Sequence, residues 1–213
     1  MGQQKKFMLD SWKMSIEPPF RVIGIYGVNA TGKSTLAHEI SRYYPEYDTV
    51  ATDNPLAIKR MLEPNNPIFQ NSSYTQWKRF GEPTPKNIWA GFIQYRESMG
   101  DFLDCLLERA RDQRVGMIFE GIHIDPRRFF GIRGIDVNLF LLHVSDRKVH
   151  EEHTRQKCAY RPELMDRLET NFSYIEEIQR GLLKEAREIG GIGIIETGDS
   201  IKEAVSKIRE GLS

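Results

Sequence analysis

Cysteine is scarce in this sequence, and neither sign of charge is in excess. Two cysteines, Cys105 and Cys158, stand far apart in 213 residues, with no CxxC pair or Cys/His quartet around them. They are too few for a disulfide framework, which favours a reducing, cytoplasmic location. The 30 basic residues equal the 30 acidic ones, so the chain lacks the overall field that holds nucleic acid or an anionic membrane.

Long apolar runs are also missing. The most apolar stretch, VNLFLLHV at 137–144, is far too short to cross a bilayer. Residues 1–19 are polar and lack the apolar centre of a signal peptide. Charged residues make up 28% and hydrophobic residues 39% of the chain, a mixture typical of soluble globular proteins. We therefore expect a soluble protein without a membrane partner, with a polar arm at 1–19 and one domain at 20–213.

Short apolar runs and helical patterns alternate along that domain. The apolar runs lie at 21–26, 48–52, 115–120, 137–144 and 192–196. Because each run is continuous rather than alternating, we expect strands that are covered on both faces. Helical patterns lie between them, the longest at 87–113 and 162–190. This order predicts an α/β fold in which right-handed crossovers build a parallel sheet.

The stretch GVNATGKST follows the first apolar run and opens a helical pattern. It matches G-x-x-x-x-G-K-[ST], the P-loop motif, from Gly27 to Ser34. Its glycines permit a backbone path whose N–H groups surround phosphates, and the helix adds its positive end. We expect Lys33 to contact the β- and γ-phosphates of ATP and Ser34 to bind Mg²⁺. The predicted ATP-binding residues are Gly27, Asn29, Ala30, Thr31, Gly32, Lys33, Ser34, Thr35 and, from a later segment, Arg155.

Two carboxylates follow other predicted strands. Glu120 ends the run at 115–120, and Asp53 follows the run at 48–52. Ligands of an open parallel sheet collect at the carboxyl ends of its strands. We therefore predict, beside Lys33, two further catalytic residues: Glu120 holding Mg²⁺, directly or through water, and Asp53 accepting the proton of an attacking hydroxyl. The alternatives are a carboxylate that caps a strand and an ordinary Asp-Asn-Pro turn or helix start.

Two segments are predicted to form lids. Residues 63–87 are rich in Pro, Asn and Ser yet contain several aromatic residues, which favours a substrate lid over a disordered linker. Residues near 147–162 carry several cations and are the predicted ATP lid, with Arg155 and Arg161 as the preferred partners of phosphate charge. The alternative for any single arginine is an ordinary solvated position.

Two further sequence patterns bear on whether the protein is a zinc enzyme or a GTPase. HEEHT at 150–154 is similar to the zinc motif H-E-x-x-H, but its histidines stand three apart instead of four. We therefore expect a solvated helix face rather than a zinc site. The guanine-reading N-K-x-D and the D-x-x-G switch of GTPases are missing, which favours ATP and a kinase over a molecular switch.

Several motifs together resemble the 2-phosphoglycerate kinase family of archaeal and bacterial P-loop kinases. They are GVNATGKST, TD at 52–53, NSSYTQW at 71–77, AGF at 90–92, FEGIHIDP at 119–126 and RP…LETNFSYIEEIQ between 161 and 179. The resemblance implies a P-loop NTPase fold of the nucleoside-monophosphate-kinase type, a three-layer sandwich around a five-stranded parallel sheet. It also implies transfer of the ATP γ-phosphoryl group, with Mg²⁺, to a hydroxyl of a small molecule.

The resemblance further implies which residues lie near the acceptor. They are Asp53, Ser73, Tyr74, Glu120 and His123, and we add Arg127, Arg128 and Arg161 as partners for negative charge. Leu56 and Glu176 stand where the family has arginines, the residue type that grips carboxylates and phosphates bidentately. Three hypotheses therefore remain: a kinase for 2-phosphoglycerate or a relative, a kinase for a less anionic alcohol such as a nucleoside or sugar, and a non-catalytic ATP sensor. The sequence does not indicate an oligomeric state.

Overall fold

A parallel sheet forms the centre of the computed structural model, which describes residues 20–159, 161–198 and 200–212; the arm predicted at 1–19 lies outside the described residues. The strands are β1 (Arg21–Tyr26), β2 (Asp48–Ala51), β3 (Met117–Glu120), β4 (Asp136–His143) and β5 (Ile192–Glu196). They pair in the order β2-β3-β1-β4-β5, and every pairing is parallel. This confirms the predicted α/β fold with a five-stranded parallel sheet.

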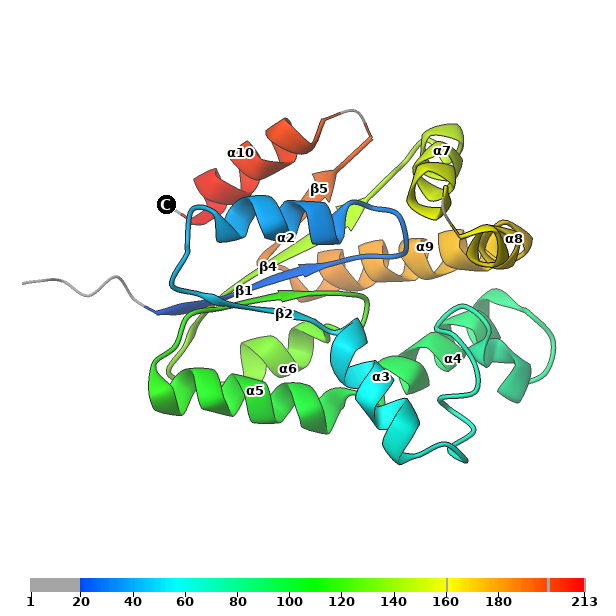
Figure 1. Cartoon of the computed structure of the whole chain (residues 1–213), viewed down its shortest axis with the longest axis horizontal. Coiled ribbons are helices and arrows are strands. Elements are labelled where there is room, and N and C mark those ends of the chain that lie inside the picture. Colours follow the sequence, from blue (N-terminus) through cyan, green and yellow to red (C-terminus); the bar gives the residue numbers. More distant parts are fainter. Residues whose placement is uncertain (1–19, 160, 199, 213) are drawn as a thin grey trace, which may run out of the picture.

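Helices cover both faces of this sheet (Figure 1). They are α2 (Lys33–Ser41), α3 (Asp53–Leu62), α4 (Pro85–Glu97), α5 (Gly100–Gln113), α6 (Pro126–Gly131), α7 (Arg147–Cys158), α8 (Pro162–Thr170), α9 (Phe172–Ile189) and α10 (Ile201–Leu212), with a short 3₁₀ helix, η2 (Gln76–Arg79). α2 and α10 lie on one face, and α4, α5, α6 and α9 lie on the other. The result is the predicted three-layer sandwich.

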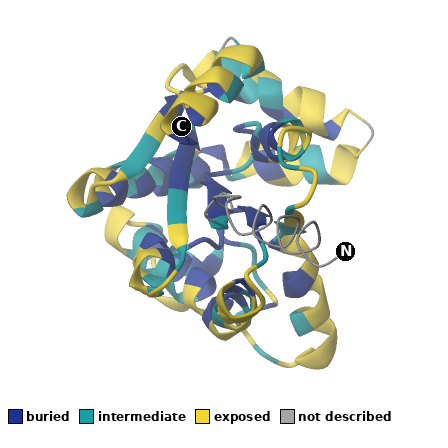
Figure 2. Ribbon diagram, turned by 90° about the vertical axis from the view of Figure 1, so that its left-hand side faces the viewer, coloured by how far each residue is buried: buried dark blue, intermediate teal, exposed yellow. Residues whose placement is uncertain are grey.

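The apolar strands form a core on each side of the sheet. In β1, Val22 faces the cluster made with α4, α5, α6 and α9, while Ile23 and Ile25 face the cluster made with α2 and α10. Figure 2 shows the strands buried and the outer faces of the helices exposed. A strand buried on both faces cannot alternate apolar and polar residues, which is why these runs are continuous in the sequence.

Two helices predicted as single are each divided. The prediction at 87–113 is wrong because α4 ends at Glu97, where the Ser98 hydroxyl donates to the Tyr95 carbonyl at 2.7 Å. The prediction at 162–190 is wrong because Asn171 separates α8 from α9 and its side-chain amide donates to the Arg167 carbonyl at 2.8 Å. In both places a short polar side chain bonds to the backbone of the preceding turn and competes with continued helix.

A buried ion pair joins α4 to α9. The Arg96 guanidinium donates to the Glu185 carboxylate through two hydrogen bonds of 2.6 and 2.9 Å. The two side chains are only 2% and 5% exposed. Such a bidentate geometry offsets much of the cost of burying two charges.

The carboxyl ends of three strands meet at one edge of the sheet. Glu120 of β3 is in register with Ile25 of β1 and with Ala51 of β2. The residues that follow β1 and β2 therefore lie on either side of Glu120.

Among the described helices, none combines the length and the apolar character that a membrane span requires.

Candidate active site

The P-loop motif forms the turn between β1 and α2. Gly27 has a φ of 148°, and a Cβ there would collide with the backbone carbonyl oxygen of Leu142 on the neighbouring β4. Glycine is therefore required where the chain leaves the sheet. The loop ends at Lys33, the first residue of α2. The N-terminal end of this helix, which carries the positive end of its dipole, therefore lies next to the loop at the carboxyl ends of the strands.

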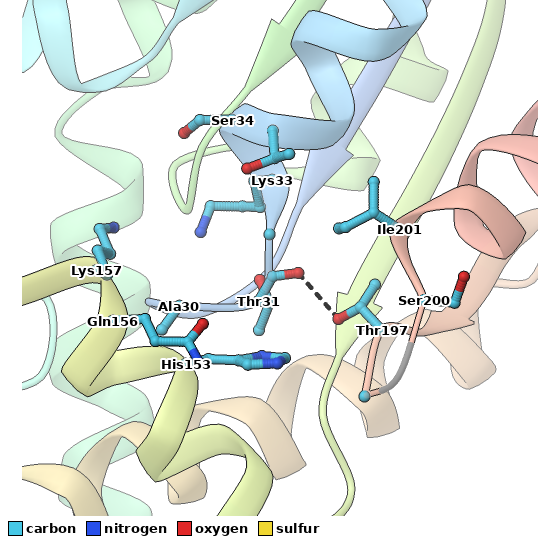
Figure 3. A pocket seen from close by; sticks show the side chains of 13 residues that line it. Ala30, Thr31, Lys33, Ser34, His153, Gln156, Lys157, Thr197, Ser200 and Ile201 are labelled. Carbon is cyan, nitrogen blue, oxygen red and sulfur yellow. Dashed lines mark hydrogen bonds between the residues drawn. The ribbon is translucent and has the colours of Figure 1, made fainter.

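Side chains from three directions hold the carbonyl groups of the loop. The Val28 carbonyl accepts from the Lys33 ammonium at 2.7 Å and from the Thr31 hydroxyl at 3.0 Å. The Thr31 carbonyl accepts from the hydroxyl of Thr197, just after β5, at 2.9 Å (Figure 3). The Asn29 carbonyl lies 2.7 Å from Nε2 of His150 on α7. The loop is thus braced by its own helix, by α7 and by the end of β5.

A cavity of about 420 Å³ opens above the loop (Figure 3). Its lining comprises Ala30, Thr31, Gly32, Lys33, Ser34 and Thr35 of the loop, His153, Gln156 and Lys157 of α7, and Thr197, Gly198, Ser200 and Ile201 after β5. Six of the predicted ATP-binding residues therefore share one cavity. Gly27 and Asn29 are not among the lining residues.

Lys33 supplies a buried positive charge to this cavity. Its pKa is lowered from 10.5 to about 8, chiefly by burial and also by the nearby Lys157, while Glu120 and Asp53 act in the opposite direction. In Figure 3 the ammonium groups of Lys33 and Lys157 face each other across the cavity. Because the Lys33 ammonium bonds only to a neutral carbonyl among its described contacts, the donor set fits a polyanion such as a polyphosphate.

Ser34 lines the cavity and lies next to Glu120. The Ser34 hydroxyl donates to the Glu120 carboxylate at 3.1 Å. A hydroxyl and a carboxylate are oxygen ligands of the kind that Mg²⁺ prefers. In the part of the chain that the structure describes, no group of three or more His, Cys, Asp and Glu side chains could hold a metal. A Mg²⁺ at this pair would therefore take its remaining ligands from phosphate or water.

Asp53 and His123 lie on the β2 and β3 side of the loop. Asp53 begins α3 with its side chain 80% exposed, and its carboxylate is 4.0 Å from Nδ1 of the buried His123. The same Nδ1 is 2.8 Å from the Thr52 hydroxyl. Gly121 makes this approach possible because, at its φ of 143°, any Cβ would collide with that hydroxyl. Burial lowers the pKa of His123 to about 4, so the imidazole is neutral near pH 7.

Tyr95 of α4 contacts both His123 and Arg60. The two rings lie 5.3 Å apart between centroids, and the Tyr95 hydroxyl accepts from the Arg60 guanidinium at 3.2 Å. Burial raises the pKa of Tyr95 to about 12. Within the described part of the molecule, the buried Tyr74 hydroxyl and Nε2 of His123 have no hydrogen-bond partner. Beside Asp53, the molecule therefore offers unsatisfied polar groups and the charge of Arg60.

The predicted substrate lid is packed in this structure. Phe69, Tyr74 and Gln76 are buried, because the segment includes η2 and lies against α4. Ser73 and Tyr74 line a narrow gap against Val28 and Asn29 of the phosphate loop. The segment 63–87 thus reaches the loop, while its action as a lid stays a prediction.

The chain is similar to curated archaeal proteins named 2-phosphoglycerate kinase. The protein of Methanothermobacter thermautotrophicus is 28% identical over 207 residues, covering 90% of this chain and 66% of that protein. The protein of Methanopyrus kandleri is 29% identical over 203 residues, with 90% and 60% covered. This chain therefore spans about two thirds or less of the length of these relatives. The resemblance expected from the motifs is confirmed.

The fold also has a counterpart among solved structures. A crystal structure of a protein from Chloroflexus aurantiacus superposes with a TM-score of 0.50 and 14% identity, covering 93% of this chain and 98% of that one. At this identity the likeness concerns the fold alone. No protein-family model matches the chain.

The predicted arginines do not line the cavity above the loop. Arg155 lies within 3.6 Å of Glu152 and of Glu169, and Arg161 is exposed at the start of α8. Arg127 donates to Glu185, and Arg128 donates to Asp104. Each guanidinium except that of Arg161 thus has a carboxylate partner elsewhere. The predicted phosphate and substrate contacts of these four residues stay predictions.

The face of α7 explains what the sequence reasoning missed. One face of α7 lies toward the phosphate loop and carries His150, His153 and Lys157, which recur at i, i+3 and i+7. Another face of the same helix carries Arg147 and Arg155, which pair with Glu151. The helical period alone could have grouped the two sets. It could not have told which set faces the phosphate loop. Arg60 and Tyr95 were missed because nothing in their spacing separates them from surface and core residues.

Proposed function

We propose that this protein is a Mg-ATP-dependent kinase whose acceptor is a hydroxyl of a small molecule, 2-phosphoglycerate or a close relative. The observation that carries the proposal is the buried Lys33 ammonium in the P-loop cavity, together with the exposed Asp53 carboxylate 4.0 Å from His123 on the β2 and β3 side of the loop. The names of the archaeal relatives support both the activity and the acceptor.

In the nucleotide half, the triphosphate lies along the backbone N–H groups of residues 30–35. Lys33 exchanges its bond to the Val28 carbonyl for phosphate oxygens, and Lys157 adds a second positive charge from α7. Ser34 and Glu120 would hold Mg²⁺, directly or through water, and the ion would neutralise phosphate charge. Lys157 takes the part that the sequence suggested for Arg155.

In the acceptor half, Asp53 accepts the proton of the attacking hydroxyl. The bond between the γ-phosphorus and the bridging oxygen of ADP breaks as the bond to the acceptor oxygen forms. Nε2 of His123 and the Tyr74 hydroxyl, which are buried without hydrogen-bond partners among the described residues, are the neutral polar groups that we assign to the acceptor. Arg60 supplies positive charge one turn of α3 beyond the buried Leu56.

The test is ADP release from Mg-ATP with 2-phosphoglycerate and with a panel of small alcohols. We expect release with 2-phosphoglycerate and a fall of ~10² or more in turnover for Lys33→Ala, since a donor to developing phosphate charge is lost. Lys148→Ala is the control, because Lys148 is an exposed lysine of α7. Near-normal turnover in Lys33→Ala would contradict the proposal.

A less anionic acceptor is the second candidate. Leu56 is buried and apolar, and Glu176 is bound to Arg147 at 2.9 Å, so neither position offers an acceptor the positive charge of an arginine. Activity on another alcohol that 2-phosphoglycerate does not inhibit in large excess would favour this candidate. Nucleotide binding with no transfer to any acceptor would favour an ATP sensor.

A further inference from the structure

His150 ties α7 to the middle of the phosphate loop. Its Nε2 lies 2.7 Å from the Asn29 carbonyl oxygen, and its side chain is 1% exposed. The ring packs edge-on against Phe172, the first residue of α9, with 4.9 Å between centroids. Because a carbonyl only accepts hydrogen bonds, Nε2 of His150 carries the proton and donates it.

The bonded carbonyl belongs to the peptide that precedes Ala30. In a planar trans peptide the carbonyl of Asn29 and the N–H of Ala30 point in opposite directions. Because His150 binds the Asn29 carbonyl from the side of α7, the N–H of Ala30 points away from His150. Ala30 also has a φ of 60°, a left-handed conformation that is unfavourable for a residue with a Cβ. A hydrogen bond from outside the loop can offset part of the cost of that conformation.

We infer that His150 is a positioning residue for nucleotide binding. It holds the Asn29–Ala30 peptide so that the loop presents its N–H groups to the phosphates, and it joins that peptide to the helix that carries Lys157. This inference rests on the proposed use of the cavity for a nucleoside triphosphate. The helix face that bears His150 therefore influences nucleotide affinity through the backbone of the loop as well as through Lys157.

Two substitutions of His150 separate the hydrogen bond from the packing. Leu fills the site without a donor, whereas Gln places an amide N–H near the position of Nε2. We expect His150→Leu to weaken Mg-ATP and Mg-ADP binding about 10-fold in calorimetric titration, and His150→Gln to stay within about 3-fold of the wild type. Thr154→Val is the matched control, because Thr154 is buried on the same helix and its hydroxyl donates within the helix to the His150 carbonyl. We expect its nucleotide affinity to be unchanged.

A second readout does not depend on nucleotide. The ¹⁵N NMR signals of the neutral His150 ring should show the proton on Nε2 in the folded wild type. Equal affinity of folded His150→Leu and wild type, or equal weakening by Leu and Gln, would overturn the inference, as would a proton on Nδ1 alone. Failure of the proposed function is distinguishable, because the wild type itself would then bind no Mg-ATP or transfer no phosphoryl group.

Discussion

The two halves of the candidate site are built in different ways. The nucleotide half is a continuous loop of backbone, and its carbonyls are held by Lys33, His150 and Thr197. The acceptor half consists of side chains from separate segments, among them an exposed Asp53 and a buried His123 with an unpartnered nitrogen. Recognition of phosphate by backbone requires a short motif, whereas recognition of an acceptor requires the tertiary fold.

The largest expected effect in the acceptor half belongs to Asp53. Asp53→Asn removes the group that accepts the hydroxyl proton, so we expect kcat to fall by ~10² with little change in the KM of ATP. Steady-state kinetics in both substrates measures this. Asp101→Asn is the matched control, since Asp101 is also an exposed carboxylate in the first turn of a helix. A rise in the KM of ATP as large as the fall in kcat would place Asp53 in the nucleotide half instead.

Arg60 tests whether the acceptor carries negative charge. If Arg60 contacts an anionic group, Arg60→Ala should raise the acceptor KM about 30-fold and leave the KM of ATP unchanged, because a charge-assisted hydrogen bond contributes about 2 kcal/mol. Arg109→Ala removes an exposed arginine that pairs with Asp48 at 2.8 Å and should change neither constant. An unchanged acceptor KM in Arg60→Ala would favour an uncharged acceptor.

A smaller effect should distinguish the two faces of α7. Lys157→Ala removes a cation that faces Lys33 across the cavity, and we expect kcat to fall about 10-fold. Arg155→Ala should stay within about twofold of the wild type, because Arg155 pairs with exposed carboxylates. Parallel assays of the two variants at saturating ATP make the comparison. The reverse order of effects would mean that α7 turns or moves when substrates bind.

The smallest effect concerns stability and pH. His123 has a pKa of about 4 against an ordinary value of 6.5, chiefly because of burial, with Asp53 opposing and Arg60 and Lys33 reinforcing the shift. Between these values the unfolded chain binds more protons than the folded one, so acidification from pH 6.5 toward pH 4 should lower the free energy of unfolding. In urea titrations His123→Asn should lose less stability than the wild type over this range. Parallel losses would show that the imidazole is protonated when folded.

Much of the fold could be predicted from the sequence because it depends on local pattern. Continuous apolar runs identify buried strands, and parallel topology brings Lys33, Asp53 and Glu120 to one edge. The helix breaks at Ser98 and Asn171 were missed because single side-chain-to-backbone bonds cause them. Periodicity does not reveal such bonds.

Less of the site could be predicted, because it depends on how helices are rotated. The sequence shows that α7 carries cations, but only its packing against the loop shows that Lys157, rather than Arg155, faces the cavity. Tyr95 follows the apolar pattern of a core helix, and its contact with His123 is visible only in the folded chain. The charge of an arginine is evident from sequence, whereas its partner is not.

The buried pair of Arg96 and Glu185 has a mechanical consequence. Removing Glu185 would leave the buried Arg96 guanidinium with only Asp125, at 3.7 Å, as a carboxylate partner, at a cost of roughly 3–5 kcal/mol, so we expect α4 and α9 to move together. Tyr95 is the neighbour of Arg96 on α4, so this side of the proposed acceptor site belongs to the same pair of helices. If the proposed reaction requires a closing motion, we expect it in elements outside this pair, such as α3, α7 and α8.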